Sequence, residues 1–257
     1  MNFKRISTVT GLLVSSVLLL SETPVQAASF SPFSFQTNWS GFPPKGDILL
    51  ESVVVDGETL SDFSFVTDAT IISNDVFSGG NTGAASSDLG DDATVGLSVE
   101  DPSNADILGS LGNPYLSSIV DTEERGRAIV EVSFANPVSQ FFFWERGMNS
   151  KLLVEALNDV GEVVASYLFD SKSSTYAGFD LDTKEIDSEQ RVGSIGLLLE
   201  GATTQTLRLS SLGSSFNGPD YKVAAASTPV PEPVTFAGLG LTAGMLILSR
   251  RRASKSA

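Results

Sequence analysis

The sequence predicts an all-β protein whose body is an antiparallel β-sandwich of the jelly-roll kind. Short runs with strand-like composition recur about every 8 to 15 residues and are separated by Gly, Asn, Asp and Ser. Between the two ends of the chain, no stretch longer than about ten residues keeps the spacing of an amphipathic helix. These two observations favour many short strands over helices.

Several runs carry specific strand signals. Residues 127–134 alternate apolar and polar side chains with period two and stop at Asn136-Pro137, and the aromatic run 138–144 follows. Residues 47–55 lead into Asp56-Gly57, which is typical of a tight hairpin. Further strands are expected at residues 152–157, 163–169, 175–181, 192–199 and 206–212.

Two segments have a different composition. Residues 73–116 are rich in Gly, Ser, Asn and Asp, which predicts long loops on the rim of the sandwich. Residues 217–229 resemble a flexible linker, so the predicted folded body is residues 28–216.

The N-terminus has the order of a secretory signal. Lys4 and Arg5 precede a short apolar helix, Pro24 ends that helix, and Ala27 closes a small-residue cleavage site. We therefore expect residues 1–27 to be a signal peptide that signal peptidase cuts after Ala27, with Ala28 as the alternative position.

The C-terminus has three consecutive parts in residues 230–257. The first is a proline-flanked acidic motif, which consists of Val230, Pro231, Glu232 and Pro233. Residues 234–249 then carry no charge and as a helix would span about 24 Å, somewhat less than the hydrocarbon core of about 30 Å, and we expect them to form a transient transmembrane helix. A basic cluster follows that would stay on the cytoplasmic side, formed by Arg250, Arg251 and Arg252.

This tail resembles the PEP-CTERM sorting signal. The resemblance implies processing by an exosortase, a membrane enzyme that cuts at or near the Pro-Glu-Pro motif. Three further segments are also similar to exosortase-dependent surface proteins of cyanobacteria: Asn38-Trp39-Ser40, residues 44–50 and residues 143–150. The expected route is export, an inner-membrane intermediate, and then the cell surface or the extracellular space.

Composition excludes several function classes. Residues 28–233 contain 10 of the 16 basic residues and 30 of the 31 acidic residues, which gives this part of the chain a formal charge of −20. Such a body repels nucleic acid and anionic lipid. The chain has no Cys and no His, which excludes disulfides, thiolate or imidazole zinc sites and Ser-His-Asp catalysis. No pair among the acidic residues stands out as a glycosidase pair, and an enzyme would require a cleft with closely opposed carboxylates.

The expected function is non-catalytic: an exported surface or matrix protein that associates with extracellular polysaccharide. The alternative is a carbohydrate-binding module in which Trp144 stacks on a sugar while Glu145 and Arg146 bind its hydroxyls. In the other interpretation, Trp144 belongs to the core, with Glu145 and Arg146 as a surface pair at a strand end.

The sequence requires no cofactor, but a structural calcium site is a hypothesis. Calcium prefers six to eight oxygen ligands from flexible acidic loops. Two acidic clusters could supply them, although neither matches an EF-hand: Asp88, Asp91 and Asp92 in one, and Asp180, Asp182, Glu185, Asp187 and Glu189 in the other.

Overall fold

The computed structural model describes residues 27–79, 85–186 and 188–227. The predicted signal peptide up to residue 26, the sorting motif, the transmembrane segment and the arginine cluster lie outside these residues. Within the described part, no helix is both long and apolar enough to cross a bilayer.

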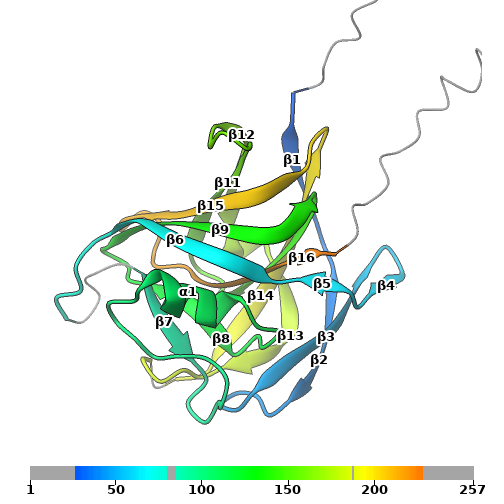
Figure 1. The fold of residues 1–257 in the computed structure, drawn as a ribbon. Coiled ribbons are helices and arrows are strands. Elements are labelled where there is room, and N and C mark those ends of the chain that lie inside the picture. Colours follow the sequence, from blue (N-terminus) through cyan, green and yellow to red (C-terminus); the bar gives the residue numbers. More distant parts are fainter. Residues whose placement is uncertain (1–26, 80–84, 187, 228–257) are drawn as a thin grey trace, which may run out of the picture.

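The body is an antiparallel β-sandwich, as the sequence predicts, and its strands form three sheets (Figure 1). The main sheet has eight strands: in spatial order β1 (Ser29–Phe33), β14 (Gln190–Glu200), β10 (Gln140–Arg146), β16 (Asp220–Ala226), β8 (Ser118–Thr122) and β7 (Ala85–Leu89), with β13 (Thr175–Leu181) paired to β14 and β5 (Phe63–Ser64) paired to β16. The second sheet has five strands: β12 (Val163–Asp170), β11 (Lys151–Leu157), β15 (Thr204–Leu212), β9 (Arg127–Val138) and β6 (Val66–Asn74). A small third sheet contains β2 (Gln36–Gly41), β3 (Ile48–Val55) and β4 (Glu58–Leu60).

Two helical elements complete the body: α1 (Asn104–Leu111) and the 3-10 turn η1 (Ser171–Ser173). Helix α1 begins with a capping box, in which the Ser103 hydroxyl accepts from the Asp106 amide while the Asp106 carboxylate accepts from the Ser103 amide. Ile107 and Leu111 anchor the helix in the core.

Local sequence explains the clearest strands. The alternation in residues 127–134 becomes alternating burial along β9, which is the pattern of a strand with one face on the core. The predicted hairpin between β3 and β4 turns at Asp56 and Gly57, which both have positive φ (50° and 87°), the conformation of a type I′ turn.

The main sheet is buried on both faces because a separate apolar cluster packs against each. Along β10, Phe141 and Phe143 enter the larger cluster, which the five-stranded sheet covers. Phe142 and Trp144 enter the second cluster, which the small sheet covers with Ile48, Leu50 and Val53 among others. A strand that is buried on both faces has a continuous apolar sequence instead of an alternating one, as residues 141–144 do.

Both ends of the body lie at one end of the main sheet. Ser29, at the start of β1, pairs with Glu200, and Ala225, near the end of β16, pairs with Phe141 at the start of β10. The opposite end of β10 is marked by the pairing of Arg146 with Asp220. The seven residues of β10 separate these two ends by roughly 20 Å.

The prediction of a linker at residues 217–229 is wrong for residues 220–226. These residues form β16, which is buried throughout and lies between β10 and β8. Within this strand, Ala224 and Ala225 are paired with Phe142 and Phe141. Small side chains leave room for these neighbouring rings, so a short alanine run fits in the middle of the sheet.

The prediction of rim loops throughout residues 73–116 is also wrong in part. Residues Ala85–Leu89 form the buried strand β7, and α1 follows at Asn104–Leu111. The Ser-Ser-Asp sequence in β7 has low strand propensity, but its pairing with β8 overrides that local preference.

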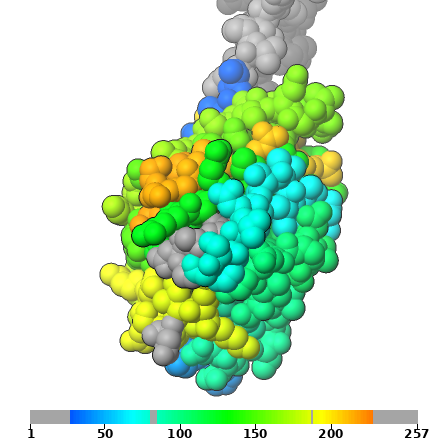
Figure 2. All heavy atoms as spheres, turned by 90° about the vertical axis from the view of Figure 1, so that its left-hand side faces the viewer, coloured from blue at the N-terminus to red at the C-terminus, as the bar shows by residue number. Residues whose placement is uncertain are grey.

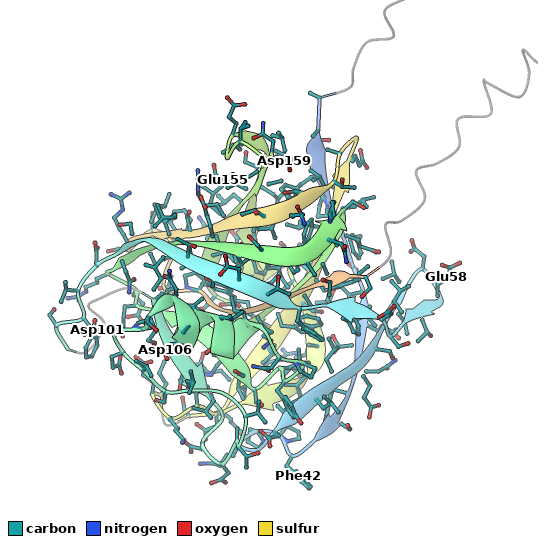
Figure 3. The ribbon with its side chains drawn as sticks, viewed as in Figure 1. Phe42, Glu58, Asp101, Asp106, Glu155 and Asp159 are labelled. Carbon is teal, nitrogen blue, oxygen red and sulfur yellow. The ribbon has the colours of Figure 1, made fainter. Side chains whose placement is uncertain are left out.

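Replacing Phe142 with alanine should lower the free energy of unfolding by about 3–5 kcal/mol, because the cavity lies inside the second cluster. The Phe142 ring is fully buried, and its centroid lies 5.1–6.5 Å from those of Phe33, Phe35, Phe63 and Trp144. Phe42→Ala is the matched control, since Phe42 is 80% exposed and points away from the body (Figure 3). Urea unfolding measures both, and equal losses would contradict the assignment of the core.

A second test addresses β16. A chain of residues 28–216 should not unfold cooperatively, because removing β16 uncovers Phe141 and Phe142 and breaks the sheet between β10 and β8. A chain of residues 28–227 should show a single cooperative urea transition by circular dichroism. Similar transitions for the two chains would mean that β16 is dispensable.

Candidate functional site

A cavity of about 530 Å³ lies at the end of the main sheet that is remote from Ser29 and Ala226. Its lining residues come from segments that are distant in sequence, and the cyan, green, yellow and orange parts of the chain adjoin one another on the face shown in Figure 2. Acidic side chains dominate the described lining: Glu100, Asp121, Glu123, Glu124, Glu185 and Asp220. Arg146 is the one basic residue among the described residues of the lining.

The pairing of β7 with β8 places the two innermost carboxylates. Ser86 is opposite Asp121 and Asp88 is opposite Ile119. Because side chains on paired strands alternate together, Asp88 and Asp121 are diagonal neighbours on the same face of the sheet. Asp88 has no exposed surface and Asp121 is 4% exposed.

The segment after β13 brings Glu185 to these aspartates. The Lys184 amide donates to the Leu89 carbonyl (3.1 Å), and Thr183 forms a β-bridge with Gly90. This pairing lays the segment along the end of β7. The Ser86 hydroxyl then donates to Glu185 Oε2 (3.2 Å).

Two more carboxylates come from neighbouring segments. Val99 exchanges two backbone hydrogen bonds with Ser87 (2.8 and 2.9 Å), which holds the following residue, Glu100, near β7. Glu123 comes directly after β8. Gly218 packs against the end of that strand, where a Cβ atom would clash with the Thr122 carbonyl oxygen.

The five carboxylates form two overlapping triads. In the inner triad, one carboxylate oxygen each of Asp88, Asp121 and Glu185 lies within 4.8 Å of the others. Glu100, Glu123 and Glu185 satisfy the same criterion and form the outer triad. Glu185 belongs to both, so the triads form a single site, which we call the acidic cage.

Several cage oxygens are buried without a partner. Asp88 Oδ2, Asp121 Oδ2 and Glu123 Oε1 have no hydrogen-bond partner among the described residues. An unsatisfied buried polar group costs about 1–3 kcal/mol, and more when it is charged. The cage therefore requires a proton or a cation.

Burial and mutual repulsion shift the acidity of the cage. Burial, with the neighbouring carboxylates, raises the pKa of Asp121 well above its usual range and that of Glu123 to about 8. Burial also raises the pKa of Asp88 and of Glu100. These shifts have one cause: the folded protein disfavours several buried negative charges at close range.

Asp220 connects the cage to Arg146. Burial raises the pKa of Asp220 to about 6, although its contacts with Asp121 and with the Arg146 guanidinium oppose that shift. Arg146 Nη1 lies 3.3 Å from Asp220 Oδ2. Its other donors reach backbone carbonyls, with Nε to Leu181 (3.0 Å) and Nη2 to Ser188 (2.9 Å). The arginine thus neutralises Asp220 and fixes the segment that carries Glu185.

The proposed sugar contact at Trp144, Glu145 and Arg146 is wrong in its central residue. Trp144 is 2% exposed, lies in the second apolar cluster and donates from Nε1 to Thr37 Oγ1 (2.9 Å). No sugar can stack on it. The alternative of a surface pair also fails, because Glu145 and Arg146 are buried and point to opposite faces of β10.

Glu145 has a structural role. Its carboxylate accepts from the Met148 amide (2.8 Å) and from the Ser150 hydroxyl, which ties down the turn between β10 and β11. Burial raises its pKa to about 8 despite these hydrogen bonds.

The structure brings together one member of each predicted acidic cluster, Asp88 and Glu185. Other members lie elsewhere: Asp91 and Asp182 form ion pairs with Lys45 (2.6 and 3.3 Å), and Asp187 lies outside the described residues. Sequence reasoning missed Glu100, Asp121 and Glu123. The available signal was Asp121 itself, an acidic residue that directly follows the β-branched pair Ile119-Val120 of β8.

Comparison of the chain with protein-family models, with curated proteins and with solved structures finds no match. The fold and the acidic cage are therefore interpreted from their own geometry.

Glu145→Gln should stabilise the protein increasingly as the pH rises from about 5 to about 8. In this window the unfolded chain has released the proton of Glu145, while the folded protein, with the pKa raised to about 8, still holds it, so the wild type loses stability with pH. The variant lacks this loss, and the difference should reach on the order of 2 kcal/mol.

Urea unfolding at several pH values measures this difference. Glu58→Gln, on the exposed β3–β4 hairpin, controls for the loss of one negative charge (Figure 3). If Glu145→Gln destabilises the protein equally at every pH, Glu145 is ionised in the folded state and this account of it is wrong.

Proposed function

We propose that the chain is an exported, non-catalytic protein of the cell surface or extracellular matrix, with a jelly-roll-like ectodomain. In this proposal, signal peptidase removes residues 1–27 and an exosortase processes the tail at Pro231-Glu232-Pro233. The transmembrane helix at residues 234–249 holds the protein in the inner membrane until then.

One observation carries the proposal: the two ends of the body lie at the same end of the main sheet. At this end, Ser29 pairs with Glu200, and Ala226 directly follows Ala225, which pairs with Phe141. The acidic cage lies at the opposite end of the main sheet. A body that is tethered to a membrane through either end would therefore present the cage away from the bilayer. The acidic surface would also be repelled by anionic lipid headgroups.

The described packing contacts of the body lie between the two proposed cleavage sites. Ala27 is exposed, whereas Ala28 already packs against the larger apolar cluster. At the other end, the Ser227 amide donates to the Asp62 carbonyl (3.1 Å), three residues before Val230. Both processing events would therefore leave the folded body intact.

The geometry of the cage favours a non-catalytic role. A glycosidase needs two carboxylates on opposite sides of a substrate bond, with space for the sugar between them. The cavity does contain closely opposed carboxylates, but Asp88 is fully buried and Asp121 is in contact with Asp220. Little room is left for a substrate between the inner acids.

Mass spectrometry of the protein recovered from its host tests the proposal. The expected chain begins near Ala28, ends near Pro233 and is found outside the cytoplasm. Replacing Pro231, Glu232 and Pro233 with alanine should leave the tail attached and the protein in the membrane fraction, because the extended motif is lost.

Alanine at Ser227, Thr228 and Pro229 is the matched control, since it changes three residues immediately before the motif. This control should be processed normally. Recovery of wild-type protein from the cytoplasm with Ala257 as its last residue would overturn the proposal.

A further inference from the structure

The acidic cage combines two features that point to a ligand. Five carboxylates from four segments converge in two triads that share Glu185. In addition, the fully buried Asp88 and the 4%-exposed Asp121, which are both members of the inner triad, each have one carboxylate oxygen (Oδ2) with no hydrogen-bond partner among the described residues. Convergence alone is common on acidic surfaces, but unpartnered buried oxygens are not.

We propose that the acidic cage is a calcium-binding site, with the inner triad of Asp88, Asp121 and Glu185 as its centre and Glu100 and Glu123 at its mouth. The proposal concerns the folded body alone, so it does not depend on how the chain is exported or processed.

Two basic side chains on neighbouring segments already have partners. Arg146 pairs with Asp220 and donates to the backbone carbonyls of Leu181 and Ser188. Lys45 lies between Asp91 and Asp182. Neither donates to a residue of the two triads, so a small cation is the ligand that fits the remaining oxygens.

The donor set selects calcium among the common metal ions. All five donors are carboxylates, and the whole chain lacks the Cys and His ligands that zinc and copper prefer. Carboxylates that bind through one or both oxygens can supply the six to eight ligands of calcium, whose coordination tolerates irregular geometry. Magnesium requires a nearly ideal octahedron and retains several waters, which suits a crowded cage less well.

A bound ion would connect segments that are remote in sequence. Asp88 lies on β7, Asp121 on β8, and Glu185 on the segment between β13 and β14, which crosses β7. Calcium would therefore hold that segment against the sheet and increase the stability of this end of the body. The chain has no disulfide to serve this purpose.

Calcium titration of the full-length chain in detergent, by calorimetry and thermal unfolding, tests the site. Millimolar calcium should raise the Tm by about 5 °C or more over the value in chelator, and magnesium at the same concentration should raise it less. The absence of both binding heat and a Tm shift would overturn the proposal. A magnesium shift as large as the calcium shift would overturn the assignment to calcium.

Asp121→Asn separates a cation site from a merely structural cluster. In chelator the variant should unfold at the wild-type Tm or above it, because one buried carboxylate has been removed from among its neighbours. In calcium it should bind at least tenfold more weakly and lose most of the Tm shift. Wild-type affinity in this variant would contradict the inner triad as the binding centre.

Two further variants complete the design. Glu185→Gln should show the same pattern, and it keeps the test decisive if Asp121→Asn does not fold. Asp159→Asn, at the exposed turn before β12 (Figure 3), removes one negative charge far from the cage and should leave calcium affinity unchanged. An equal loss of affinity in Asp159→Asn would show that calcium binds to the general acidic surface instead.

Discussion

Every residue of β10, from Gln140 to Arg146, is buried, and the arrangement of the whole body depends on this strand. Its aromatic rings enter one apolar cluster on each face of the main sheet, so the five-stranded sheet and the small sheet both pack against it. The last residue of the strand is Arg146, which reaches Asp220 and fixes the segment that carries Glu185. The same strand therefore organises the core and orients one wall of the acidic cage.

The acidic cage, in contrast to the core, lowers the stability of the folded protein. It gathers carboxylates whose burial raises their pKa values, and oxygens of Asp88, Asp121 and Glu123 have no partner among the described residues. Burying like charges costs free energy unless a counter-ion or protons neutralise them. The cluster lies at the end of the body remote from Ser29 and Ala226, where a positively charged ligand would neutralise it.

Local patterns in the sequence predicted much of the fold and little of the site. The period-two alternation of β9, the Asp56-Gly57 turn and the aromatic run of β10 are local signals, and the structure confirms them. The sequence does not predict β16 as a strand, because the role of its alanines depends on aromatic rings of a strand about 80 residues away in sequence. The role of Asp121 is equally hidden in the local sequence, because only the pairing of β7 with β8 shows that Asp88 is its neighbour.

The most direct test of calcium binding in the acidic cage is a crystal structure of the protein, from crystals grown in millimolar calcium. The account predicts strong metal density between Asp88, Asp121 and Glu185, with carboxylate oxygens at about 2.3–2.6 Å from the ion. Carboxyl groups that contact one another directly, with no metal density between them under the same conditions, would show that protons neutralise the cluster and would contradict the account.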